Sequence, residues 1–204
     1  MLTTASEPLY YTDMGNLLIV SHFSGEAERL EARLRERGID VFLALPGENV
    51  DEPRLPWKPS SPFSSKSLLL QVLQKGELER LVCLHRVHPE SGGPLSFSEI
   101  EERVDTCLKG WLFLLKEAAE LTRKSEVVLV LDADGEGSSP LAPLLEAGFL
   151  SLLEVCRRMG IPARGLRREK AALDPLVDSI LEGDGKSLYR WREIRERRRL
   201  WFSK

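Results

Sequence analysis

Short apolar runs rich in β-branched residues alternate with helix-like patterns along almost the whole chain. The clearest run is Glu126–Leu131 (EVVLVL), followed by a Gly/Ser-rich loop and an apolar helix expected at Pro140–Met159. Neighbouring parallel strands need crossover connections, so this alternation predicts a parallel sheet with helices on both faces. We therefore expect an α/β chain with a three-layer Rossmann-like fold, built on a doubly wound, mostly parallel sheet of about six to seven strands.

The other expected elements follow the same alternation. Strands are predicted at Asn16–Ser21, Asp40–Leu45, Arg54–Lys58, Glu79–Val87, Pro162–Arg167 and Lys186–Trp191. Helices are predicted at Gly25–Arg37, Ser64–Leu78, Ser98–Lys124 and Leu173–Leu181. Gly38 is the expected C-cap of the first helix, and Ser98 with Glu101 forms an expected capping box. The 204 residues are expected to form one domain over 1–204, with an N-terminal extension at 1–14 and a basic C-terminal tail at 192–204.

Composition excludes several classes of function. A net charge of −3 gives no electrostatic argument for nucleic acid or an anionic membrane. No apolar run approaches the ~18 residues that span a bilayer, and the N-terminus has no basic and apolar signal pattern. Cys83, Cys107 and Cys156 lack metal-type spacing, which favours buried free thiols in a reducing compartment. We expect a cytoplasmic protein with no nucleic-acid or membrane partner.

Three fragments carry a family resemblance. Val104–Ala118 (VDTCLKGWLFLLKEA) is similar to the fourth helix of short-chain dehydrogenases/reductases, with the family's catalytic asparagine at Cys107. Glu146–Phe149 is similar to the segment after the catalytic tyrosine, and Met159–Ile161 to the lead into the sixth strand. Their order and spacing make the chain resemble this family over almost its whole length, which implies a dehydrogenase-like fold.

The resemblance places any cofactor contact in Ser21–Glu26 (SHFSGE), where the family pattern is TGxxxGxG. Glycines let the backbone approach the cofactor phosphates at the helix N-terminus, and only one of three remains. The candidate cofactor-binding residues are Ser21, His22, Ser24 and Gly25. Glu26 adds negative charge where phosphates would sit, and His22 is expected to face solvent or cap a turn.

The fourth-strand family motif NNAG is replaced by Leu84-His85-Arg86-Val87. Large and charged side chains in place of small ones are expected to fill the pocket. His85 and His88 have no third ligand, so we expect loop residues rather than a metal site.

The resemblance also implies that the catalytic residues are missing. The family serine falls near Asp132 or Ala133, and the tyrosine and lysine fall near Ala142 and Glu146. The family's proton transfer needs the tyrosine hydroxyl, with the lysine lowering its pKa and the serine holding the carbonyl. The PG after the sixth strand reads Arg168-Glu169. We expect no catalytic residue at these positions.

The preferred hypothesis is a non-catalytic short-chain dehydrogenase-like domain without cofactor, acting as a structural or protein-interaction module. It is also similar to the non-catalytic structural half of polyketide ketoreductase units. One alternative is a divergent NAD(P)-dependent oxidoreductase. Another is a Mg²⁺-dependent, Toprim-like phosphoryl-transfer domain using Asp132 and Asp134, because carboxylates at a strand end can hold Mg²⁺.

The fourth and fifth helices are apolar on most sides, which indicates burial on most sides. In the resembled family these helices form a dimer interface, so we expect a homodimer or a contact with a catalytic homologue. The expected interface residues are Trp111, Leu115, Leu145, Phe149 and Leu152. The basic C-terminal run with interleaved tryptophans is expected to pack on the body of the domain.

Overall fold

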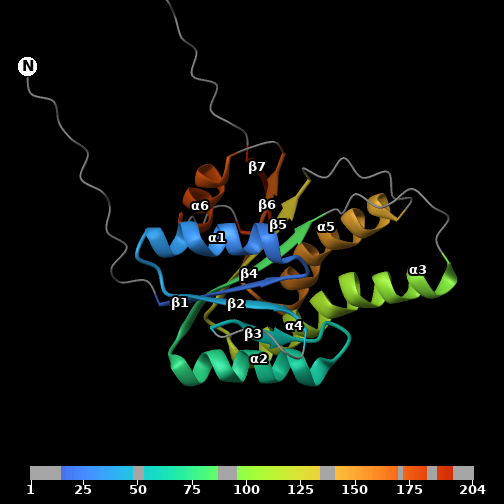
Figure 1. Cartoon of the computed structure of the whole chain (residues 1–204), viewed down its shortest axis with the longest axis horizontal. Helices are drawn as coiled ribbons and strands as arrows, with labels where there is room; N and C mark the ends of the chain where they lie inside the picture. The colour runs from blue at the N-terminus through green and yellow to red at the C-terminus, as the bar shows by residue number, and fades with distance from the viewer. Residues whose placement is uncertain are drawn as a thin grey trace, which may run out of the picture.

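A parallel sheet forms the centre of the computed structural model, which describes residues 15–47, 53–86, 96–133, 141–169, 172–182 and 188–194. Seven strands pair in the order β3-β2-β1-β4-β5-β6-β7, and every pairing is parallel (Figure 1). The strands are β1 (Asn16–Ser21), β2 (Val41–Pro46), β3 (Leu55–Trp57), β4 (Leu78–Arg86), β5 (Glu126–Asp132), β6 (Ala163–Arg168) and β7 (Trp191–Ile194). The expected doubly wound sheet is confirmed.

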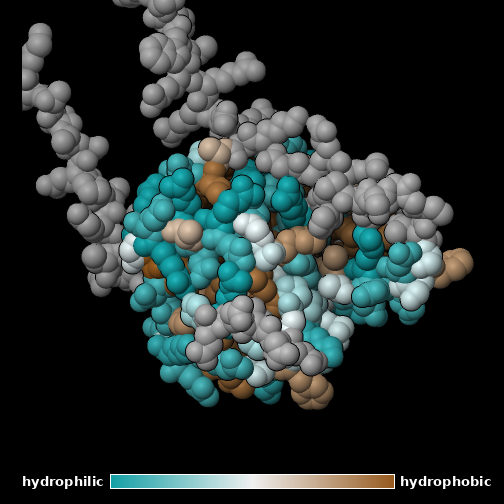
Figure 2. All heavy atoms as spheres, viewed as in Figure 1, coloured by the Kyte–Doolittle hydropathy of each residue, from teal (hydrophilic) through white to brown (hydrophobic). Residues whose placement is uncertain are grey.

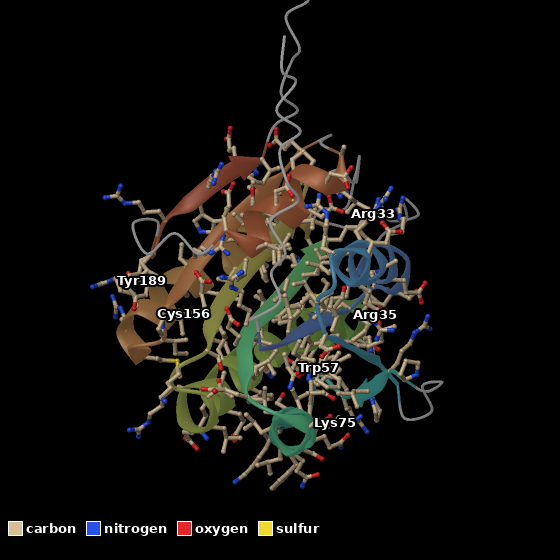
Figure 3. The ribbon with its side chains drawn as sticks, turned by 90° about the vertical axis from the view of Figure 1, so that its left-hand side faces the viewer. Arg33, Arg35, Trp57, Lys75, Cys156 and Tyr189 are labelled. Carbon is tan, nitrogen blue, oxygen red and sulfur yellow. The ribbon has the colours of Figure 1, made fainter. Side chains whose placement is uncertain are left out.

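Helices cover both faces of the sheet, giving the expected three layers (Figure 1). One layer contains α1 (Ser24–Glu36) and α6 (Leu173–Leu181); the other contains α2 (Pro62–Lys75), α4 (Gly110–Leu121) and α5 (Ala142–Met159). Successive strand residues face opposite layers, so Leu17 packs toward α1 and Leu18 toward α2 and α4. Trp57 and Cys156 lie in the second layer's core, whereas Arg33 and Arg35 are on α1 (Figure 3).

The strand order reverses at β1. The chain runs outward from β1 to β2 and β3, then crosses back to β4, which pairs with the other side of β1. In open α/β sheets, ligands bind outside the carboxyl ends of the strands at such a reversal. The carboxyl ends of β1 and β4 therefore mark the place to look for a site.

Two helix boundaries differ from the expected ones. The capping box is formed by Ser96 and Glu99, not Ser98 and Glu101, so α3 (Phe97–Val104) begins earlier than expected. Two overlapping Ser-x-x-Glu frames occur here, and the sequence alone does not choose between them. Helix α2 ends at Lys75 rather than Leu78, which belongs to β4.

The predicted single helix at Ser98–Lys124 is interrupted by a π-helical turn. Helix α3 continues through η1 (Asp105–Lys109) into α4. Gly110 follows the turn, and a Cβ there would lie 2.7 Å from the Cβ of Pro59. Such turns are frequent at functional sites, and this one contains Cys107, the family's asparagine position.

The last strand lies later than predicted, at Trp191–Ile194 rather than Lys186–Trp191. Trp191 packs on Gly165, where a Cβ would collide with the indole, and its Nε1 donates to the Leu150 carbonyl at 3.2 Å. This tryptophan packs on the body as expected, whereas residues 195–204 of the tail and the 1–14 extension lie outside the described residues.

Two further observations concern the cysteines and the possibility of a membrane-spanning helix. Cys83 and Cys156 are buried and Cys107 is half-buried, all three as free thiols. Among the described helices, none is long and apolar enough to cross a membrane.

Candidate functional site

A pocket of about 410 Å³ opens at the carboxyl end of β1, beside the N-terminus of α1. Its walls are His22, Phe23, Ser24, Gly25, Glu26, Arg29 and Arg86. The volume falls within the range of small-molecule sites. Space is open at Gly25, where an added Cβ would meet nothing within 4 Å. Three of the four candidate cofactor residues therefore line one pocket.

Ser21, the fourth candidate, is buried, and its side chain hydrogen-bonds to the backbone of the loop between β1 and α1 instead of lining the pocket. Its hydroxyl oxygen accepts from the Phe23 amide at 3.1 Å and donates to the Phe23 carbonyl at 3.0 Å. Phe23 is the N-cap of α1 but supplies no side-chain cap. The first turn of α1 therefore lies against the pocket, with Glu26 as its acidic side chain.

Glu26 is 4% exposed and already paired with two arginines. One carboxylate oxygen lies 2.6 Å from Arg168, which comes from the end of β6, and the other contacts Arg29. The expectation that Glu26 puts a carboxylate at this position is confirmed. Its carboxylate is paired with arginines of the same chain and also lines the pocket.

Arg168 also pairs with Asp132, the last residue of β5. Its Nε and Nη2 donate to the two Asp132 oxygens at 3.2 and 3.3 Å, and Arg86 lies 3.8 Å from the same carboxylate. Asp132 is 1% exposed. One buried ion-pair network thus joins α1 to the carboxyl ends of β4, β5 and β6.

An aromatic cluster fills the space beneath the pocket. The His22 ring centroid lies 4.9 Å from that of Trp57 and 4.6 Å from that of Trp111. His85 stacks on Phe149 at 4.8 Å, and the two histidine rings are 6.4 Å apart. The expectation of a solvent-facing or turn-capping His22 is wrong, because its ring turns inward onto the two tryptophans. His85 lies within β4 and is 1% exposed, so the expectation of a loop residue is wrong for His85, and His88 lies outside the described residues.

Both histidines are held neutral. Burial, with a smaller contribution from His85, lowers the pKa of His22 to about 3, and burial lowers the pKa of His85 to about 4. Both ring nitrogens of each histidine, and the indole nitrogen of Trp111, are buried without a hydrogen-bond partner among the described residues. Burying unpaired polar atoms costs free energy of folding. The cluster therefore has polar atoms at its centre, but its two histidines carry no charge.

The positions that the resemblance assigns to catalysis hold other groups. Asp132 is ion-paired, Ala142 is a buried apolar side chain, and Glu146 pairs with Arg167 at 3.1 Å. Burial raises the pKa of the Cys107 thiol to about 11, so this thiol is a poor nucleophile.

Tyr189 is the one tyrosine among the described residues, since Tyr10 and Tyr11 lie outside them. Its amide donates to the carbonyl of Ala163, where β6 begins, so it lies at the opposite edge of the sheet from the pocket.

The Toprim-like hypothesis requires Asp132 to present its carboxylate to a metal. Arg168 and Arg86 contact that carboxylate instead, and Asp134 lies outside the described residues. Across the described ranges, no cluster of three or more metal-ligating side chains occurs. The contacts of Asp132 therefore do not favour this hypothesis.

Four of the five expected interface residues lie inside the domain. Trp111, Leu115, Phe149 and Leu152 belong to the core between the sheet and the second helical layer, and Leu145 is half-buried. Helices that cover a sheet bury one face on that sheet, so these side chains serve the chain itself. A partner would meet the outward residues Leu112 on α4 and Leu144 on α5, which are 41% and 53% exposed.

The residues that sequence reasoning missed are the pairing partners. The charge of Glu26 and the replaced family positions of Arg86 and Arg168 were visible in the sequence. That these residues join Asp132 in one ion-pair network was not. Trp57 lies in the predicted strand at Arg54–Lys58, but its packing on His22 was not predicted. Parallel pairing brings the ends of β4, β5 and β6 together, and only the strand order shows this.

No family model and no curated protein sequence matches the chain. Solved structures do match its fold. A short-chain dehydrogenase/reductase from Serratia marcescens aligns with a TM-score of 0.69 at 11% identity, covering 89% of this chain and 96% of that chain.

Two other structures agree. An enoyl-[acyl-carrier-protein] reductase (NADH) from Aquifex aeolicus has a TM-score of 0.64 at 14% identity, covering 88% of this chain and 95% of that chain. An NADH-dependent reductase in complex with NAD has a TM-score of 0.68 at 10% identity, with the same coverage of 88% and 95%. The chain therefore has the short-chain dehydrogenase/reductase fold, as its sequence fragments indicate.

Proposed function

We propose that this chain is a non-catalytic domain of the short-chain dehydrogenase/reductase fold that serves as a structural or protein-interaction module. The observation that carries the proposal is the buried ion-pair network of Glu26, Arg168 and Asp132. It spans the carboxyl edge of the sheet, where this fold binds ligands. A dinucleotide does not fit these residues, because a buried carboxylate stands at the first turn of α1 and bridging side chains cross the strand ends.

The aromatic cluster supports the same proposal. His22, Trp57, Trp111 and His85 occupy the volume below the first turn of α1 and the end of β4. General acid–base catalysis by a placed side chain contributes about 10²–10⁴-fold, and the assigned positions hold an alanine and two arginine-paired carboxylates in place of the family's serine, tyrosine and lysine. Loss of the cofactor site and of the proton donor together favours a scaffold role.

The cofactor provides the first test. NADPH and NADH, titrated into the protein and followed by nicotinamide fluorescence and thermal shift, are expected to show no saturable binding below about 1 mM, the upper end of usual Michaelis constants. The ion-pair network and the acidic first turn of α1 are the reason. A catalytic dehydrogenase of the same fold serves as the positive control. A micromolar dissociation constant for either nucleotide would contradict the proposal.

A second candidate function is a divergent NAD(P)-dependent oxidoreductase. The pocket of about 410 Å³ at the N-terminus of α1, with open space at Gly25, favours it. A micromolar nucleotide affinity in the same titration, together with nucleotide oxidation by any carbonyl or alcohol substrate, would select this candidate.

As an interaction module, the chain is proposed to pair through α4 and α5 with a second copy or a catalytic homologue. Leu112 and Leu144 are exposed apolar side chains of these helices, and Met159 at the end of α5 is a third. Elsewhere, the face that carries α1 is mainly hydrophilic (Figure 2). We therefore place the proposed contact at these two leucines.

Self-pairing is tested by light scattering after gel filtration. At micromolar concentration the mass is expected to be about twice the 23.1 kDa of one chain, and Leu112→Glu with Leu144→Glu is expected to reduce it to one chain. Phe63→Glu is the matched control, because Phe63 is 82% exposed but lies on α2. A monomeric parent protein, or an equal effect of the control, would count against self-pairing through these helices.

A further inference from the structure

We propose that Glu26 is an internal occupant of an anion site, an autoinhibitory contact that keeps small phosphate-bearing ligands out of the pocket at the N-terminus of α1. The carboxylate pairs with two guanidinium groups, that of Arg29, which lines the pocket, and that of Arg168, which is buried. The inference rests on the proposed function, in which the parent chain takes no dinucleotide.

The first argument is the charge around the pocket. Arg29, Arg86 and Arg168 lie around two carboxylates, those of Glu26 and Asp132. Arg168 contacts both carboxylates, Arg86 contacts Asp132, and Arg29 contacts Glu26. Among the described residues of this network, removing the Glu26 charge would leave the three guanidinium groups with the Asp132 carboxylate, beside a pocket that Arg29 and Arg86 line.

The second argument is the burial and reach of Glu26. An acidic residue in the first turn of a helix usually acts on the helix dipole from the surface, worth about 0.3–1 kcal/mol. Glu26 is 4% exposed, and it reaches from α1 to Arg168 on β6, 2.6 Å away. A helix-dipole role requires neither the burial nor the second arginine. Both are what a carboxylate needs to stand in for a bound anion.

The third argument comes from unpaired polar atoms at the pocket. The ring nitrogens of His22 are buried without a partner among the described residues, and His22 lines the pocket. Backbone N–H groups in the first turn of a helix favour anions, and the N-cap Phe23 supplies no competing side chain. Guanidinium groups bind phosphate with paired hydrogen bonds. Phosphate is therefore the ligand chemistry that these groups fit.

The experiment compares pyrophosphate binding by the parent chain and by Glu26→Gln, using isothermal titration calorimetry and amide chemical shifts. Glu26→Gln removes the charge but keeps the size, and it is expected to bind at least ~10-fold more tightly, with the largest shifts at the first turn of α1. Glu36→Gln is the matched control, because Glu36 is an exposed acid of the same helix that pairs with Arg33. Adding Arg86→Met to Glu26→Gln is expected to abolish the gain.

Equal affinity of Glu26→Gln and the parent chain would overturn the inference. An equal gain in Glu36→Gln would also overturn it, since net charge alone would then explain the result. If Glu26→Gln does not fold by circular dichroism, Glu26→Gln with Arg168→Met removes both buried partners and keeps Arg29, Arg86 and the helix N-terminus. This variant is then expected to show a smaller gain of at least ~3-fold, and no gain overturns the inference.

The two proposals fail in different ways. Micromolar NADPH binding by the parent chain would refute the proposed non-catalytic function. No nucleotide binding by the parent chain, with no pyrophosphate gain in the variants, would refute the role of Glu26 alone.

Discussion

Lowering the pH from 7.5 to 5 is expected to destabilise the folded chain by about 4 kcal/mol, because two histidines with buried ring nitrogens stay neutral while the unfolded chain takes up protons. His22 and His85 have pKa values lowered from 6.5 to about 3 and about 4. A lowered folded pKa gives stability that is complete above pH 6.5 and is lost as the pH falls below it. At pH 5 each histidine costs about 2 kcal/mol, since one pKa unit corresponds to about 1.4 kcal/mol.

This loss is a large part of the roughly 5–15 kcal/mol that stabilises a typical domain. It corresponds to a fall in melting temperature of about 8–16 °C for a chain of this size. The measurement is calorimetric or circular dichroism melting at both pH values. A His22→Phe/His85→Phe variant is expected to lose most of the pH dependence, and an unchanged melting temperature of the parent chain at pH 5 would contradict the prediction.

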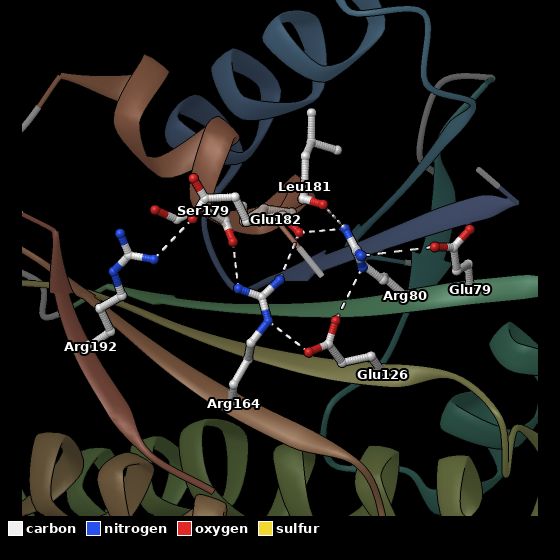
Figure 4. A network of polar contacts seen from close by, with 9 residues as sticks. Glu79, Arg80, Glu126, Arg164, Ser179, Leu181, Glu182 and Arg192 are labelled. Atoms are coloured by element: carbon white, nitrogen blue, oxygen red, sulfur yellow. Dashed lines mark hydrogen bonds and ion pairs between the residues drawn. The ribbon is translucent and has the colours of Figure 1, made fainter. Parts of the chain in front are cut away.

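Arg164→Met is expected to destabilise the chain by about 3–5 kcal/mol, the usual cost of removing one partner from a buried ionic network. Arg164 is 3% exposed and lies at the amino edge of the sheet, opposite the pocket (Figure 4). Its Nε donates to Glu126 at 2.7 Å, its Nη2 donates to the Ile180 carbonyl at 2.8 Å, and its Nη1 donates to the Ser179 carbonyl. These carbonyls end α6. In the variant, Arg80 still donates to the Ile180 carbonyl and pairs with Glu126, so the cost comes from the Ser179 carbonyl, which loses its arginine donor, and from the lost buried charge.

Chemical denaturation measures this effect, and Arg192→Met provides the matched control. Arg192 also pairs near the end of α6, with Glu182 at 3.0 Å, but it is 56% exposed (Figure 4). Exposed pairs contribute about 0–1 kcal/mol, so the control is expected to change little. Similar losses in both variants would show that burial of Arg164 is not the cause.

The layers of the fold could be predicted from sequence because each strand of this sheet is buried on both faces. Continuous apolar runs such as Glu126–Leu131 are then easily told from helical patterns. The alternation of these runs with helices predicts that the strands pair in parallel. Boundaries were less certain where two local signals competed. The overlapping frames at Ser96 and Ser98 are one example, and the π-helical turn before Gly110 is another.

The candidate site was predictable only in part. The residues of the loop after β1 were chosen because the family resemblance places the phosphate contacts between the first strand and the first helix. The inward turn of His22 was not, because burial of a neutral histidine depends on Trp57 and Trp111, which come from distant segments. The interface residues were misplaced for a related reason: apolar periodicity shows that a face is buried, but not whether the chain or a partner covers it.

The salt bridge from Arg168 to Glu26 also limits how this scaffold could be redesigned. Grafting a tyrosine and a lysine onto α5 would restore proton-transfer groups, yet the salt bridge between β6 and α1 would still lie beside the pocket at the N-terminus of α1. An engineer would have to replace that salt bridge with uncharged side chains of matching volume before any transplanted chemistry could reach a substrate.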